Sequence, residues 1–228
     1  MKEEKKYGFY GWETADVKDK NGLTPRDYYD LLSGAWSAET CAPRMRDEWT
    51  RQNKTLGQCS VTAFLIQDQF GGKVYGVKLD DGNFHCFNEV DGVVFDLTSE
   101  QFGSEKLDYT DCPEQFREIH FKKTEKLRRY ELLKENLAKE FFKREADAKI
   151  RLLFIARVLL WVVALTATGI WMYYSVKLHM DGIFDPYEYA SHLRPVLYGG
   201  LIISIASVGV SFALYAQSRK LKRKKRLI

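Results

Sequence analysis

The 228-residue chain lacks several features that would place it in a common class of protein. Its four cysteines form no Cys-x-x-Cys pair, and they are too few and too scattered for a disulfide framework. No internal repeat, low-complexity tract or glycine-rich phosphate-binding loop is present. The first ten residues contain no apolar stretch, so we expect no cleaved signal peptide. We also expect no cofactor and a reducing compartment.

One apolar segment begins at a cysteine. Cys59 follows Gly57 closely, and a pair of glycines at 71–72 ends the segment. The apolar positions between them cover most of a helix surface, which predicts a buried central helix. A thiol at a helix N-terminus lies against unpaired backbone N–H groups, which favour the thiolate and lower the pKa of the thiol. Cys59 is therefore a candidate nucleophile.

A hairpin is predicted within residues 84–97, where two β-prone runs are separated only by an Asp-Gly pair. This pair is the favoured one for a two-residue type I′ turn. The turn sets Val90 opposite Val93, so facing residue numbers sum to 183. In this register His85 and Asp96 are diagonal neighbours on one face, roughly 5–8 Å apart at Cβ.

A cysteine at a helix start, with a histidine and an aspartate on the next strands, is typical of cysteine hydrolases and transferases. Cys59 would attack, His85 would carry the proton, and Asp96 would hold the imidazole tautomer. The Cys59 backbone N–H would be one donor of an oxyanion hole. The upstream amide side chains that could supply a second donor are Gln58, Asn53 and Gln52.

Four motifs give the chain a resemblance to the YunG-like family of small bacterial proteins. They are WSAET at 36–40, GQCSVTA at 57–63, QDQFGG at 67–72 and DLTSEQF at 96–102. The resemblance covers about residues 25–105. Together with the order of Cys, His and Asp, it implies an α+β, papain/transglutaminase-like fold in which a central helix packs on an antiparallel sheet. Cys86, just after the histidine, departs from the Tyr or Trp that is more familiar there.

Plainer interpretations compete with a catalytic one. Cys59 could be an ordinary buried thiol, and His85 a hydrogen-bonded sheet histidine. Asp96 could cap the next segment, although Thr98 begins a capping-box pattern that can do so. Zinc is the rival chemistry for Cys and His, but His85 and Cys86 are adjacent on a strand and point to opposite faces, so we predict no metal site. A binding-only relative of an enzyme remains a third interpretation.

Two uncharged stretches indicate a membrane anchor. Residues 158–176 run for 19 positions and residues 195–218 for 24 positions without a charge. A bilayer core of ~30 Å needs about 20 such residues in a helix, so we expect two transmembrane helices at about 152–176 and 195–217. Lys and Arg gather before the first stretch and after the second, which predicts a plasma (inner) membrane protein with both termini in the cytoplasm.

The formal charge of +4 is mostly a property of the C-terminal tail, since seven cations lie within 219–226. A basic tail at a bilayer indicates contact with anionic lipid, and nucleic acid is not an expected partner. Small residues along the second stretch could also support a homo-oligomer.

The predicted organisation is a flexible arm (1–24), a cytosolic papain/transglutaminase-like domain (25–112), a long connecting helix (113–150) and the transmembrane pair with its tail (151–228). The leading hypothesis is a membrane-anchored hydrolase or acyltransferase that acts on an amide or thioester. The alternative is a non-enzymatic membrane effector or scaffold, whose soluble domain binds a ligand or partner and whose spans oligomerise. The substrate itself is not predicted.

Overall fold

The computed structural model describes residues 7–182 and 194–228. The chain divides into two compact units, one ending at Phe141 and the other beginning at Phe142. The first unit is α+β and contains the only sheet of the described residues, an antiparallel one with the order β1-β2-β3. The three strands are β1 (Lys73–Lys78), β2 (Phe84–Val90) and β3 (Val93–Phe95).

The turn between β2 and β3 has the conformation that its sequence predicts. Asp91 and Gly92 both have positive φ, 51° and 77°, as a type I′ turn requires. Val90 pairs with Val93, so the predicted register is confirmed. The ladder stops at Phe95, and Asp96 instead forms an isolated bridge with the N-terminal segment.

The central helix α2 (Cys59–Phe70) packs on the sheet and begins at the predicted cysteine. Gly57 precedes it with φ +65°, a left-handed conformation that favours glycine. A Cβ at this position would lie 2.7 Å from Cys41 Sγ, so there is no room for another residue. Helix α1 (Pro25–Ala35) lies beside α2 and begins with a capping box formed by Thr24 and Asp27.

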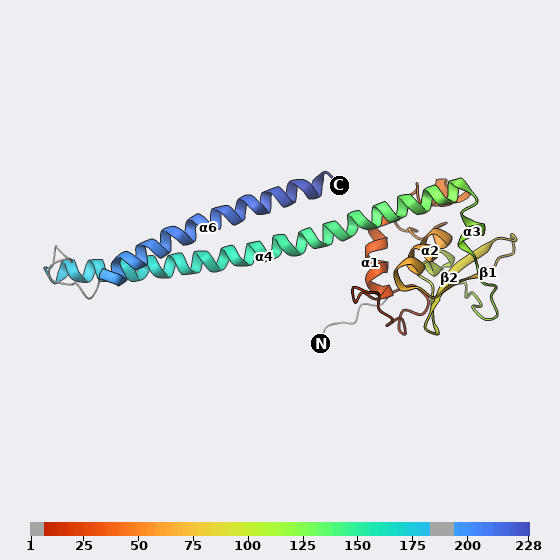
Figure 1. The fold of residues 1–228 in the computed structure, drawn as a ribbon, viewed down its shortest axis with the longest axis horizontal. Coiled ribbons are helices and arrows are strands. Elements are labelled where there is room, and N and C mark those ends of the chain that lie inside the picture. Colours follow the sequence, from red (N-terminus) through yellow and green to blue (C-terminus); the bar gives the residue numbers. More distant parts are fainter. Residues whose placement is uncertain (1–6, 183–193) are drawn as a thin grey trace. The chain divides into compact units, whose positions relative to one another are not determined.

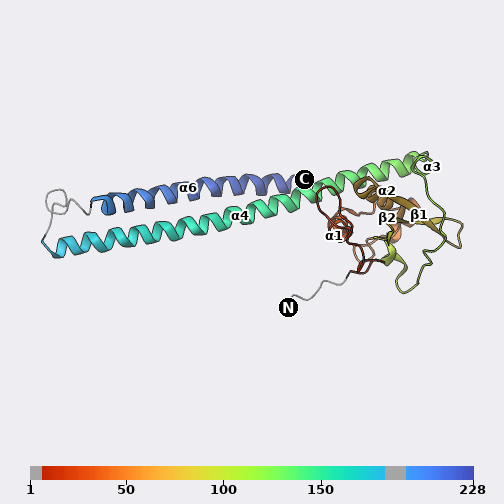
Figure 2. The same cartoon turned by 60° about the horizontal axis from the view of Figure 1, so that its bottom comes forward.

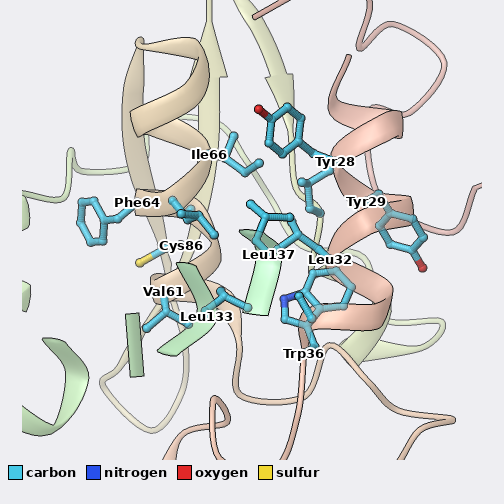
Figure 3. Close-up of a cluster of buried hydrophobic side chains, with 14 of the residues drawn as sticks. Tyr28, Tyr29, Leu32, Trp36, Val61, Phe64, Ile66, Cys86, Leu133 and Leu137 are labelled. Carbon is cyan, nitrogen blue, oxygen red and sulfur yellow. The ribbon is translucent and has the colours of Figure 1, made fainter. Parts of the chain in front are cut away.

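The hydrophobic core lies between α1, α2 and the first turns of α4 (Thr124–Met180) (Figure 3). Trp36, at the end of α1, is fully buried, and its indole N–H donates to Thr62 Oγ1 at 3.0 Å. Leu133 and Leu137 of α4 fill the space between α1 and α2. This face of α4 therefore packs on its own domain.

The long helix starts later than its sequence indicated. Instead of opening a helix, Pro113 accepts a hydrogen bond from Gly76 N of β1 at 3.1 Å, and Gln115 N donates to Val74 O at 2.8 Å. The short helix α3 (Arg117–His120) follows, and α4 begins at Thr124. The segment after Pro113 thus extends the sheet edge, because its backbone finds partners there that a helix would have supplied internally.

The expected flexible arm, residues 1–24, is packed on the domain wherever the structure describes it. Phe9 is 1% exposed, and Ala15 is fully buried. Tyr10 O accepts from Asp96 N at 3.0 Å, and Tyr10 N donates to Ser99 Oγ at 2.8 Å. Burial of the aromatic side chains offsets the entropy of ordering this segment, an outcome that the glycines and charges around them did not indicate.

In the second unit, the rest of α4 lies antiparallel to α6 (Arg194–Arg226) (Figures 1 and 2). Thr168 and Ser204 hydroxyls hydrogen bond at 2.7 Å, and Lys225 binds the Asp147 carboxylate at 2.6 Å. Both helices are long and apolar enough to cross a membrane. The apolar windows are only 11% and 17% buried, far less than in the core helix of a soluble protein.

Candidate active site

The predicted trio converges on one place in the first unit. His85 Nε2 lies 2.6 Å from Asp96 Oδ2, and both side chains are 1% exposed. Cys59 is partly exposed, and both the His85 imidazole and the Cys86 backbone N–H act to lower the pKa of its thiol. Since Asp96 occupies Nε2, Nδ1 is the ring nitrogen left for the sulfur. The hairpin register sets His85 beside Asp96, and the packing of α2 on β2 brings Cys59 to them.

The Asp96 carboxylate is held at both oxygens. Oδ1 accepts from Thr98 N at 2.9 Å and from Thr98 Oγ1 at 3.0 Å, while Oδ2 accepts from Tyr109 Oη at 2.9 Å as well as from His85. Burial raises the pKa of Asp96, but the His85 charge and these hydrogen bonds outweigh it and lower the pKa below its usual value. The aspartate is therefore a fixed anion.

The Asp96 anion stabilises a protonated imidazole, and the protonated imidazole in turn stabilises a thiolate at Cys59. Burial lowers the pKa of His85, yet the charge and hydrogen bond of Asp96 and the contact with Cys59 raise it to about 10. Burial likewise raises the pKa of Cys59, and its hydrogen bond and charge interaction with His85 lower it to about 7. Between these two values the favoured state is a thiolate beside an imidazolium.

The predicted oxyanion donors lie in different surroundings. Gln58 is fully buried and donates its amide Nε2 to Ser37 O at 2.9 Å, so one of its donors is used within the fold. Asn53 is partly buried, and its backbone donates to Thr50 Oγ1 and accepts from Leu56 N. Cys59 N–H opens α2 without a backbone acceptor among the described residues.

Three neighbours of the site were not predicted. Gln101 Nε2 lies 3.3 Å from His85 Nδ1 and donates to Thr98 O at 2.9 Å, while its Oε1 accepts from Gly57 N at 3.3 Å. Thr98 was expected to cap the next helix but makes no cap bond there and binds Asp96 instead. The Asp-x-Thr spacing was a usable signal for this contact, whereas nothing in the sequence marked Tyr109.

A cleft of about 750 Å³ opens onto the sulfur and the imidazole. Cys59 and His85 line it, and the buried Asp96 binds His85 without lining the cleft itself. Phe84, Phe102 and Phe116 give the cleft an apolar part. Within 7–182 and 194–228, no three His, Cys, Asp or Glu side chains gather in a cluster that could hold a metal ion.

These features define an α+β protein in which a helix-terminal cysteine and a buried His–Asp pair share the wall of a cleft. A sequence model of the YunG protein family matches residues 24–142, and the chain belongs to that family. It is similar to "Uncharacterized protein YunG" of Bacillus subtilis (strain 168), with 37% identity over 83 residues. This match covers 36% of the chain and 66% of the relative. No solved structure matches the chain.

Proposed function

We propose that the first unit is a cysteine-dependent hydrolase or acyltransferase that acts on an amide or thioester, with the chain topology of a papain/transglutaminase-like domain. The observation that carries this proposal is the arrangement of three side chains at an open cleft. Asp96 binds His85, and His85 lowers the pKa of the Cys59 thiol, which lines the cleft. A merely structural cysteine would be sealed in the core, as Cys86 is at 1% exposure.

The reaction would begin with attack of the Cys59 thiolate on the substrate carbonyl carbon, which forms a C–S bond and an oxyanion. The Cys59 backbone N–H at the start of α2 would stabilise that oxyanion. Collapse breaks the C–N or C–S bond to the leaving group, which takes the proton from His85 Nδ1. Water or an acceptor nucleophile then attacks the thioester and gives its proton back to His85, and the thiolate is released.

We further propose that the second unit anchors this domain in the plasma (inner) membrane, with both chain ends on the cytosolic side. The two apolar helices, with five cations at 143–157 and seven at 219–226, support this orientation. The full chain should float with liposomes in a density gradient and remain bound at high salt. Release by salt would contradict spanning helices and favour a surface contact of the basic tail.

Acyl transfer is tested by trapping the thioester on the full chain in detergent. With p-nitrophenyl acetate, we expect an acetyl adduct on Cys59 that appears within a burst and is found by peptide mass spectrometry. The partly buried Cys112 serves as a control thiol in the same chain, because burial and nearby Asp108 and Asp111 raise its pKa. Acylation of Cys59 no faster than of Cys112, and unaffected by His85→Ala, would refute the proposal and favour a binding or scaffold protein.

A further inference from the structure

The cleft carries positive charge as well as aromatic residues. Lys123 and Lys126 line it together with Cys59 and His85. The two cleft carboxylates already have partners, since Glu125 binds Arg129 Nε at 2.9 Å and Glu114 binds Lys73 at 3.1 Å. Within the part of the chain that the structure describes, neither lysine has a carboxylate partner.

Lys126 is held in place by a chain of neutral groups. Its ammonium lies 3.0 Å from His120 Nδ1, and His120 Nε2 lies 3.0 Å from Gln115 Oε1. The amide oxygen can only accept, so Nε2 carries the proton and Nδ1 accepts from the lysine. Burial and the two lysine charges lower the pKa of His120 to about 4, so the imidazole is neutral at pH 7 and does not cancel the positive charge.

The ammonium of Lys126 therefore has donors to spare. Three N–H groups are available on a lysine, and His120 takes one. Lys126 is partly buried and lines the same cleft as the reacting sulfur of Cys59; burial lowers the pKa of its ammonium, and a Cys59 thiolate acts in the opposite direction. Lys123 is exposed and adds a second cation to the lining of the same cleft.

We propose that Lys126 and Lys123 form an anion subsite of the cleft, so that the acyl substrate of Cys59 carries a carboxylate or phosphate group beside the bond that is broken. This inference rests on the proposed function, because it takes Cys59 as the nucleophile. An anion here would receive two positive charges and the free Lys126 donors, whereas a neutral substrate would leave them without a partner.

The test compares two alkylating reagents that differ only in charge. Iodoacetate and iodoacetamide both react with the thiolate by forming an S–CH2 bond and releasing iodide. Their rate ratio at Cys59 is insensitive to the thiolate fraction, so it reports on the cleft alone. In the Lys123→Met, Lys126→Met double variant we expect the iodoacetate to iodoacetamide ratio to fall about three- to tenfold. The exposed Lys106→Met is the matched control and should leave the ratio unchanged.

The outcomes separate the subsite from the proposed function. A ratio in the double variant equal to that of the unchanged chain overturns the anion subsite while leaving Cys59 chemistry intact. Failure of Cys59 to outpace Cys112 with iodoacetamide overturns the nucleophile, and the subsite with it. A normal iodoacetamide rate shows that the variants are folded, and Lys126→Arg should keep most of the ratio.

Protection of Cys59 from iodoacetamide by succinate or by inorganic phosphate, at equal ionic strength, then assigns the anion. The compound that protects at the lower concentration identifies the group, and the double variant should lose that protection.

Discussion

The removal of His85 should change how the reactivity of Cys59 depends on pH. In the folded chain, His85 lowers the pKa of the thiol from 9.0 to about 7, while burial alone would raise it. In His85→Ala we therefore expect this pKa to return to 9 or above. At pH 7 the thiolate fraction would fall from about one half to about one hundredth, which is a loss of about 50-fold.

The remaining thiolate would be more reactive per molecule, which offsets part of this loss. Nucleophilicity rises with thiol pKa with a Brønsted slope of about 0.4–0.5, so two pKa units give about eightfold. The net alkylation rate of Cys59 at pH 7 should then fall about sixfold, and the two pH–rate curves should cross near pH ~8. At pH ~9 the variant should react about fourfold faster than the unchanged chain.

The assay is alkylation by iodoacetamide between pH 5 and 10, with the Cys59 and Cys112 peptides quantified separately by mass spectrometry. The Cys112 curve should be the same in both chains, because His85 is not among the groups that shift its pKa. If Cys59 in the unchanged chain titrates like a free thiol, or if His85→Ala leaves its midpoint in place, the thiolate–imidazolium argument is wrong.

Asp96→Asn should make the free energy of unfolding less sensitive to acid. The pKa of Asp96 is lower in the folded chain than its usual 3.8, so its stabilising effect is present above that value and is lost as the pH falls further, which urea midpoints between pH 5 and 2.5 would detect. Leu133→Ala removes a fully buried side chain of α4 and should cost about 2–5 kcal/mol, whereas the exposed Lys134→Ala should stay within about 0.5 kcal/mol. Arg129→Met should cost about 2 kcal/mol, because this buried guanidinium donates to the Thr40 carbonyl at 3.2 Å, and the exposed Arg128→Met should not. Equal urea midpoints within either pair would contradict the packing of α4 on the domain.

The parts of the site that could be predicted are those fixed by local chemistry. The Asp-Gly pair sets the hairpin register through its two positive φ values, and the register sets His85 and Asp96 on one face. The apolar run after Gly57 indicates where α2 begins, and this places Cys59 at the helix terminus. Each of these steps depends on fewer than about a dozen adjacent residues, so tertiary context had little scope to override them.

The parts that could not be predicted depend on irregular chain paths. Tyr109 reaches Asp96 from the loop after η2 (Ser99–Phe102), and Tyr10 stacks on its ring with centroids 4.0 Å apart. No periodic pattern marks either tyrosine, and their contact requires two segments about 100 residues apart to meet. The same reason explains why the N-terminal segment was wrongly expected to be a flexible arm. Phe9 is buried in a core that elements distant in the sequence build, so its own neighbours in the sequence do not indicate its burial.

Helix α4 is shared by the two units of the chain, because it begins in the first unit and ends in the second. Within the first unit, Lys126 lines the cleft, Arg129 holds the Thr40 carbonyl, and Leu133 and Leu137 enter the core. The same helix continues without interruption to Met180 and contains the first apolar stretch. If this helix were only a tether, a flexible linker could join it to the domain. Its first turns would then not need to supply residues to the cleft. Because they do, removal of α4 would take away lining residues of the cleft and part of the core, so the cleft cannot be complete without this helix.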